Sequence, residues 1–231
     1  MPRDVGVVLV AAGRGSRLGG GMPKQYQPIG GVPMVLRALR AFTAHPEVVH
    51  VVLVLPAEDA AAAPDFLRGL TGPGLCLVAG GAERADSVAA GLAALDPACT
   101  TVLVHDAARP FVQREVIDAV IVRARAGQGA VAAVPVSDTL KQASPADPTL
   151  IQGTVARERL WRAQTPQGFP RAVLQRAHEL AARNGGPATD DAALVERTGV
   201  PVHLVPDSAR NLKVTTADDL ALAELLAGTH E

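Results

Sequence analysis

Short apolar runs of Val, Leu and Ala recur along the chain at wide spacing. They are continuous rather than alternating with polar residues, which is typical of β-strands buried on both faces of a sheet. Segments of helical length lie between them, and this alternation predicts βαβ units in one doubly wound, mostly parallel α/β sheet. The expected strands are Val5–Val10, Val48–Leu55, Leu75–Val78, Thr101–Val104, Ala130–Val134 and Val202–Val205. The expected helices are Pro33–Ala44, Asp59–Leu70, Glu83–Leu95, Arg114–Ala126, Pro170–Arg183, Asp190–Thr198 and Ala217–Leu226.

The alternation breaks at Val136–Trp161, which is polar and dotted with proline. Two short β-like pieces, around Asp138–Gln142 and Ile151–Val155, flank the sequence "SPADP". We therefore expect a hairpin that leaves the main sheet. The predicted organisation is one domain over residues 1–231, with residues 136–161 as an arm.

The composition narrows the class of protein. Hydrophobic residues make up 48% of the chain and aromatic residues only 3%, which predicts an aliphatic core. Lys and Arg total 22 against 23 for Asp and Glu, so a general nucleic-acid or membrane binder is not expected and any anion site must be local. The isolated Cys76 and Cys99, with neither a signal-peptide pattern nor a long apolar run, predict a cytoplasmic protein without a transmembrane span.

A glycine-rich loop, "AAGRGSRLGGGMPKQY", follows the first expected strand. Successive backbone N–H groups can form an anion-binding nest there, and Arg17 and Lys24 add two positive charges. The loop lacks the third glycine of a dinucleotide fingerprint, and the chain has no Walker motif. We favour a phosphate-binding loop over a turn with solvated basic residues. Small residues at the strand's end leave room for a base or ribose: Ala11, Ala12 and Gly13.

Other polar residues follow the expected strands. The motif "GGAERADSV" places Arg84 and Ser87 on one face of a helix. In "HDAARPF", Asp106 ends a buried strand, where a carboxylate is well placed to hold Mg²⁺ against a triphosphate. His105 is interpreted as a structural histidine. Taken alone, Thr189 predicts a helix cap, and Lys213 a solvated lysine in a short strand.

The motifs together occur in one order along nearly the whole chain: AAGxGxRxG…PKQY, GGxERxDSV, HDAARPF, DTLK, TPQGF, TDDA and NLKVT. This set resembles the 2-C-methyl-D-erythritol 4-phosphate cytidylyltransferases of the non-mevalonate isoprenoid pathway, in their monofunctional form. The resemblance implies a Rossmann-like nucleotidyltransferase fold and a Mg²⁺-dependent reaction of CTP with methylerythritol phosphate. The products would be 4-diphosphocytidyl-2-C-methyl-D-erythritol and pyrophosphate. It also implies a homodimer whose arms cross between the subunits.

The resemblance assigns roles to particular residues. The implied catalytic residues are Arg17, Lys24, Arg157 and Lys213. The implied nucleotide site consists of Ala11, Ala12, Gly13, Gly15, Gly81, Arg84, Ser87 and Asp106, with Asp106 also supporting the metal. The implied contacts to the methylerythritol phosphate are Thr139, Arg157, Thr165, Thr189 and Lys213. In a homodimer, Arg157 would serve the partner's site.

The chain departs from the family pattern at one point. An acidic residue often precedes the N-x-K triplet, but here Ala209 and Arg210 precede Asn211. Either Asp207 replaces that acid or the contact is missing. A pentitol (ribitol 5-phosphate) cytidylyltransferase is therefore the alternative activity. A non-catalytic nucleotide-binding module is less consistent with the paired cations Arg17 and Lys24.

Overall fold

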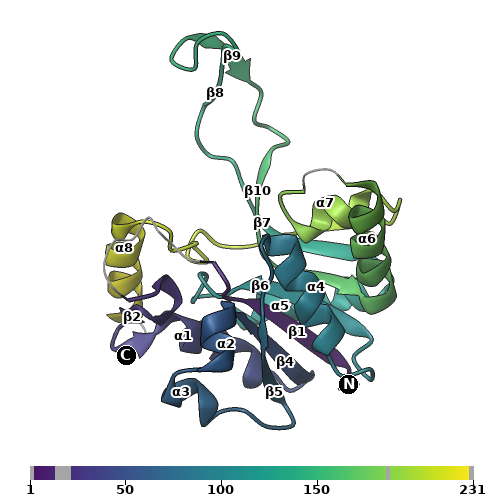
Figure 1. Cartoon of the computed structure of the whole chain (residues 1–231). Coiled ribbons are helices and arrows are strands. Elements are labelled where there is room, and N and C mark those ends of the chain that lie inside the picture. Colours follow the sequence, from purple (N-terminus) through teal and green to yellow (C-terminus); the bar gives the residue numbers. More distant parts are fainter. Residues whose placement is uncertain (1–2, 14–21, 186–187, 229–231) are drawn as a thin grey trace.

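The computed structural model describes residues 3–13, 22–185 and 188–228. A seven-stranded sheet forms the centre of the molecule (Figure 1). Among the described strands of this sheet, only β10 runs antiparallel to its neighbours, so the predicted mostly parallel α/β fold is confirmed. Across the sheet the order is β11 (Val202–Pro206), β7 (Gly129–Pro135), β10 (Trp161–Pro170), β6 (Thr101–Asp106), β1 (Val5–Val10), β4 (Val48–Leu55) and β5 (Leu75–Ala79).

Helices cover both faces of the sheet because each face carries its own apolar cluster. One cluster is packed by α1 (Met34–Thr43) and α5 (Arg114–Arg125). The other is packed by α4 (Arg84–Ala94), α6 (Arg171–Asn184) and α7 (Asp191–Glu196). A third, smaller cluster joins α8 (Ala217–Gly228) to the short hairpin of β2 (Pro28–Ile29) and β3 (Val32–Pro33).

Strand β10 was not predicted from the sequence. Its buried residues include Gln164, Thr165 and Gln167, whose side chains form hydrogen bonds inside the protein, so the strand shows no apolar run. Gly168 is required for packing: a Cβ there would lie 2.4 Å from Cγ1 of Val120 on α5. Along this strand, hydrogen bonds between buried polar side chains stabilise the burial that apolar side chains provide elsewhere.

Three local predictions were wrong. The helix expected over Asp59–Leu70 is two short helices, α2 (Ala57–Ala61) and α3 (Asp65–Arg68), because Pro64 lies between them. Lys213 lies in a segment that forms no strand. Thr189 does not cap α7, since the Asp190 side chain accepts the Ala193 N–H at 2.9 Å.

The expected hairpin is present and projects from the sheet (Figure 1). Its strands, β8 (Leu140–Ala143) and β9 (Ile151–Val155), form a separate two-stranded sheet. None of the helices in the described part of the chain combines the length and apolar character that a membrane span requires.

Candidate active site

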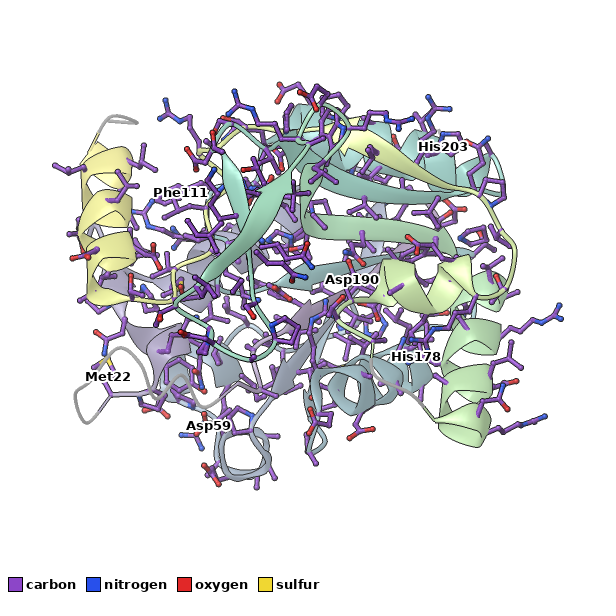
Figure 2. All side chains as sticks on the ribbon, turned by 90° about the horizontal axis from the view of Figure 1, so that it is seen from above. Met22, Asp59, Phe111, His178, Asp190 and His203 are labelled. Carbon is purple, nitrogen blue, oxygen red and sulfur yellow. The ribbon has the colours of Figure 1, made fainter. Side chains whose placement is uncertain are left out.

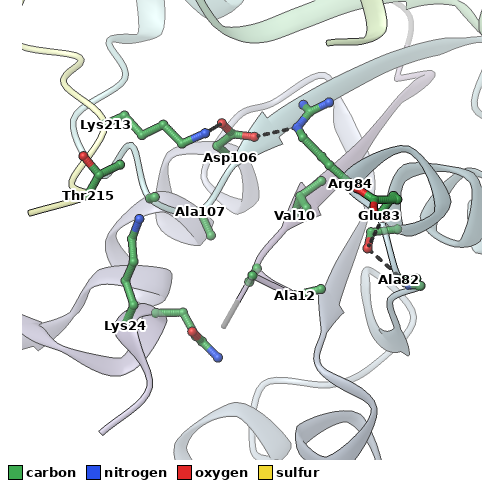
Figure 3. A pocket seen from close by; sticks show the side chains of 16 residues that line it. Val10, Ala12, Lys24, Ala82, Glu83, Arg84, Asp106, Ala107, Lys213 and Thr215 are labelled. Carbon is green, nitrogen blue, oxygen red and sulfur yellow. Dashed lines mark hydrogen bonds and ion pairs between the residues drawn. The ribbon is translucent and has the colours of Figure 1, made fainter. Parts of the chain in front are cut away.

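The carboxyl ends of β1 and β6 lie side by side, with Val10 in register with Asp106. From β1 the sheet extends through β4 and β5 on one side and through β6 on the other, which makes this a topological switch point where ligands bind. A cavity of about 290 Å³ opens there (Figure 3). Nine residues with predicted roles line it: Ala11, Ala12, Gly13, Lys24, Gly81, Arg84, Ser87, Asp106 and Lys213. The predicted Gly15 and Arg17 lie outside the described residues.

The Asp106 carboxylate lies between two cations. Arg84 Nε donates to its Oδ1 at 3.2 Å, and Lys213 Nζ donates to its Oδ2 at 2.6 Å (Figure 3). Burial alone would raise the pKa of Asp106, but the charges of Arg84 and Lys213 outweigh burial and hold that pKa well below its usual range. The carboxylate is therefore ionised at neutral pH and keeps both basic side chains in the wall of the cavity.

A second cavity, of about 210 Å³, lies on the other side of these charged groups. Arg84, Asp106 and Lys213 line both cavities. The predicted Thr165 and Thr189 line the second one, together with Arg109, Gln164, Gln167 and Asp190, which the sequence analysis did not assign to a site. The charged row thus borders two compartments, each of which can receive one ligand.

The turn that carries Lys24 is attached to α2. Tyr26 and Gln25 belong to the same 3₁₀ helix, η2 (Lys24–Tyr26), and both donate to Oδ2 of Asp59, at 2.8 and 3.3 Å. Asp59 lies on α2. Figure 3 shows the Lys24 side chain reaching into the first cavity on the side of Lys213. The "PKQY" motif thereby places a cation at the cavity wall.

Close packing joins the β5–α4 turn to the end of β1. A Cβ at Gly80 would lie 2.6 Å from both the Ala12 Cβ and the Ser87 Oγ, so only glycine fits there. The Ser87 hydroxyl accepts the Gly81 N–H at 3.2 Å and donates to the Glu83 carbonyl at 3.2 Å. Ser87 can therefore only accept a hydrogen bond from a ligand.

His105 connects three residues around the cavities, although the sequence analysis gave it no functional role. It is fully buried, and burial lowers its pKa to about 4, so the ring is neutral at pH 7. Its Nε2 donates to the Arg109 carbonyl at 3.0 Å, and its Nδ1 accepts the Thr165 hydroxyl at 3.0 Å. Thr165 Oγ1 in turn accepts the Asp106 N–H at 3.0 Å. The sequence signal for a role of His105 was its position directly before Asp106.

This buried histidine predicts acid sensitivity. Below about pH 6.5 the unfolded chain protonates His105, whereas the folded chain resists protonation down to about pH 4. Keeping His105 neutral in the fold contributes about 3 kcal/mol to the free energy of unfolding. This contribution is fully present above pH 6.5 and is lost as the pH falls to 4. Urea unfolding at several pH values is expected to show this slope. His105→Gln should reduce it and His203→Gln should not; an equal slope in all three proteins contradicts the assignment.

Comparison with known proteins places the chain in a family. Residues 5–228 match the family model described as "IspD: 2-C-methyl-D-erythritol 4-phosphate cytidylyltransferase". The chain belongs to this family. The resemblance inferred from the motifs is confirmed.

Individual relatives agree with this assignment. The chain is 43% identical over 224 residues to the cytidylyltransferase of Salinibacter ruber, with 95% of this chain and 91% of the relative covered. It is 45% identical over 228 residues to a bifunctional IspD/IspF enzyme of Desulforudis audaxviator; 97% of this chain is covered, but the chain spans only 57% of that relative's length. The solved 4-diphosphocytidyl-2C-methyl-D-erythritol synthase of Anaerococcus prevotii superimposes with a TM-score of 0.84 at 26% identity, covering 98% of this chain and 99% of that one.

Two predicted site residues of this IspD family member lie apart from both cavities. Thr139 and Arg157 are exposed on the arm, and neither is among the residues that line the cavities. Within one described chain, the fold therefore does not bring these two side chains to Asp106.

Asn211 attaches the Lys213 segment to β10. It is fully buried; its Nδ2 donates to the Thr165 carbonyl at 2.8 Å and to Asp207 Oδ2 at 2.6 Å. Its own carbonyl accepts from Arg109 Nη1 at 2.7 Å and from Gln164 Nε2 at 3.0 Å. Asp207, the candidate replacement for the missing acid, thus holds Asn211 and is not among the residues that line either cavity.

Proposed function

We propose that this chain transfers a cytidylyl group from CTP to 2-C-methyl-D-erythritol 4-phosphate. The observation that carries the proposal is the row of Arg84, Asp106 and Lys213, which borders two cavities at the switch point of the sheet. A donor nucleotide and a phosphorylated acceptor can meet across such a row. The family and the relatives' names support the choice of substrates.

The first cavity is assigned to CTP. It contains the glycine and alanine positions at the end of β1 and the entry to α4, where a base and ribose can approach the backbone. The second cavity is assigned to methylerythritol phosphate. There Arg109 and Lys213 provide positive charge for the phosphate, while Gln164 and Thr189 provide polar groups for the alcohol.

The chemistry requires little proton transfer. A phosphate monoester has a second pKa near 6, so the acceptor is largely dianionic at neutral pH and needs no general base. Its oxygen forms a bond to the α-phosphorus of CTP, and the bond to the bridging oxygen breaks as pyrophosphate leaves with the electron pair. Lys24 and Lys213 are placed to offset the repulsion between the anions and the charge that grows in the transition state. The motif alone assigns Arg17 to the same role.

Mg²⁺ is part of the proposal, and the donor set at the site fits it. Asp106 is an ionised carboxylate, and Mg²⁺ typically takes one or two carboxylates together with phosphate oxygens. No group of three metal-binding side chains occurs among the described residues, which suits an ion that arrives with the nucleotide. When bound, the ion would neutralise triphosphate charge, and Asp106 would hold it while remaining anchored by Arg84 and Lys213.

A homodimer with shared sites is also proposed. A two-stranded hairpin is marginally stable on its own in water, and the arm exposes large apolar side chains. These are Leu150, Ile151, Val155 and Leu160, of which Leu150 and Ile151 are 60% and 61% exposed. An isologous partner that covers them would bring Thr139 and Arg157 within reach of a neighbouring site. The free thiols of Cys76 and Cys99 fit the proposed cytoplasmic location.

The activity is tested by the release of pyrophosphate from CTP. Release is expected when CTP, Mg²⁺ and methylerythritol phosphate are all present, and none when the acceptor is omitted. Release that does not depend on the acceptor, or that is absent in the complete mixture, contradicts the proposal.

A further inference from the structure

A chain of hydrogen-bonded polar and charged side chains runs from α6 into the site. His178 Nε2 lies 3.0 Å from Oδ1 of Asp191, and Arg84 Nη1 donates to Oδ2 of the same carboxylate at 2.7 Å. Arg84 Nε then donates to Asp106, which also binds Lys213. The first two members of this chain, His178 and Asp191, line neither cavity, yet they are connected to all three residues of the charged row.

The roles within this chain follow from the chemistry of Asp191. Its side chain is only 1% exposed, and the hydrogen bond from His178 and the charge of Arg84 outweigh burial and lower its pKa. An ionised carboxylate can only accept hydrogen bonds, so the His178 Nε2 carries the hydrogen and donates it. Each Asp191 oxygen therefore has one charged or polar side-chain partner: His178 for Oδ1 and Arg84 for Oδ2.

Two carboxylates hold the Arg84 guanidinium. Asp106 binds its Nε and Asp191 binds its Nη1, which fixes the plane of the group in the wall between the cavities. If His178 no longer donates to Asp191, one oxygen of a buried carboxylate loses its partner, and the carboxylate is free to turn toward another donor. Arg84 then loses the fixed anchor on the side away from Asp106.

We propose that His178 is a positioning residue of the cytidylyl transfer: it fixes Asp191, which holds Arg84 in place for the nucleotide. This rests on the proposed function. His178 is not needed to attach α6 to the body of the protein, because Leu174 and Ala177 of the same helix are buried in the apolar cluster beneath it. Its hydrogen bond to Asp191 is therefore available for a role beyond packing.

The test compares two substitutions that keep the bulk of the side chain. His178→Leu removes the donor, whereas His178→Gln keeps an N–H at about the reach of Nε2. His178→Leu is expected to raise the KM for CTP and the Kd for CTP with Mg²⁺, measured by calorimetry, about tenfold, the usual effect of losing a charge-assisted hydrogen bond. The value of kcat is expected to fall less than about threefold. His178→Gln should stay within about threefold of the wild type in KM and Kd.

His203→Leu is the matched control, since His203 lies on β11 and is not a member of this hydrogen-bonded chain (Figure 2). It is expected to leave the KM, Kd and kcat unchanged. The melting temperature of every variant is measured alongside. The proposal is overturned if His178→Leu leaves CTP binding unchanged, whether or not its melting temperature falls, or if His178→Gln binds CTP as weakly as His178→Leu. A wild-type protein that binds no CTP refutes the proposed function instead.

Discussion

Lys24→Ala is expected to lower kcat by about 10²–10³ while raising the KM for CTP by less than about tenfold. The Lys24 side chain reaches into the cavity proposed for CTP, from a turn that Asp59 holds in place. Negative charge at the α-phosphate grows as the new bond forms, so a cation at that point stabilises the transition state more than the bound substrate. Steady-state kinetics with CTP as the varied substrate measures both constants.

Arg68→Ala is the control for this change. It also removes one positive charge, but from an exposed side chain on α3 whose partner is Asp65. Its kcat is expected to equal that of the wild type. If Lys24→Ala also turns over at near the wild-type rate, Lys24 has no part in the mechanism.

Mixing two inactive variants is expected to restore activity if the site is shared. Arg157 is exposed on the arm and lines neither cavity of its own chain, so it is proposed to hold the substrate phosphate in the partner's site. In a heterodimer of Lys24→Ala with Arg157→Ala, one of the two sites regains both basic residues. An equal mixture after complete exchange should therefore show about a quarter of the wild-type activity.

Subunit exchange must be shown independently, by mass spectrometry of chains that carry different tags. The unmixed variants are the baseline, and each is expected to remain inactive after the same incubation. If exchange is complete and the mixture stays at that baseline, Arg157 acts within its own chain and the arm does not share the site.

The sequence predicted the strands whose burial depends on apolar side chains. The runs at Val5–Val10 and Val48–Leu55 are strands with the expected bounds, because continuous aliphatic residues have few other places to be buried. Strand β10 could not be found in this way, since Gln164 and Gln167 are buried through hydrogen bonds formed far along the chain. The break between α2 and α3 at Pro64 was missed because the residues around Pro64 favour helix.

The sequence predicted site residues that belong to recognisable motifs, but not the contacts between those motifs. Asp106 and Lys213 were recognised separately, but their contact spans 107 positions, and no spacing rule connects residues that far apart. Asp191 lies in the TDDA motif but was given no role, and His178 was not singled out, because the function of a buried carboxylate is recognisable only from the partners that surround it. The sequence also left open whether Asp207 replaces the acidic residue that often precedes the N-x-K triplet in the family. In the structure, Asp207 binds Asn211.

The most direct test of the proposed cytidylyl transfer is ³¹P NMR of the complete reaction with CTP, Mg²⁺ and methylerythritol phosphate. The three CTP resonances are expected to be replaced by those of a cytidine diphosphate ester and of pyrophosphate, in equal amounts. With ribitol 5-phosphate in place of methylerythritol phosphate, CTP should disappear at least about tenfold more slowly. Formation of CDP with inorganic phosphate, or faster consumption of CTP with ribitol 5-phosphate, would contradict cytidylyl transfer to methylerythritol phosphate.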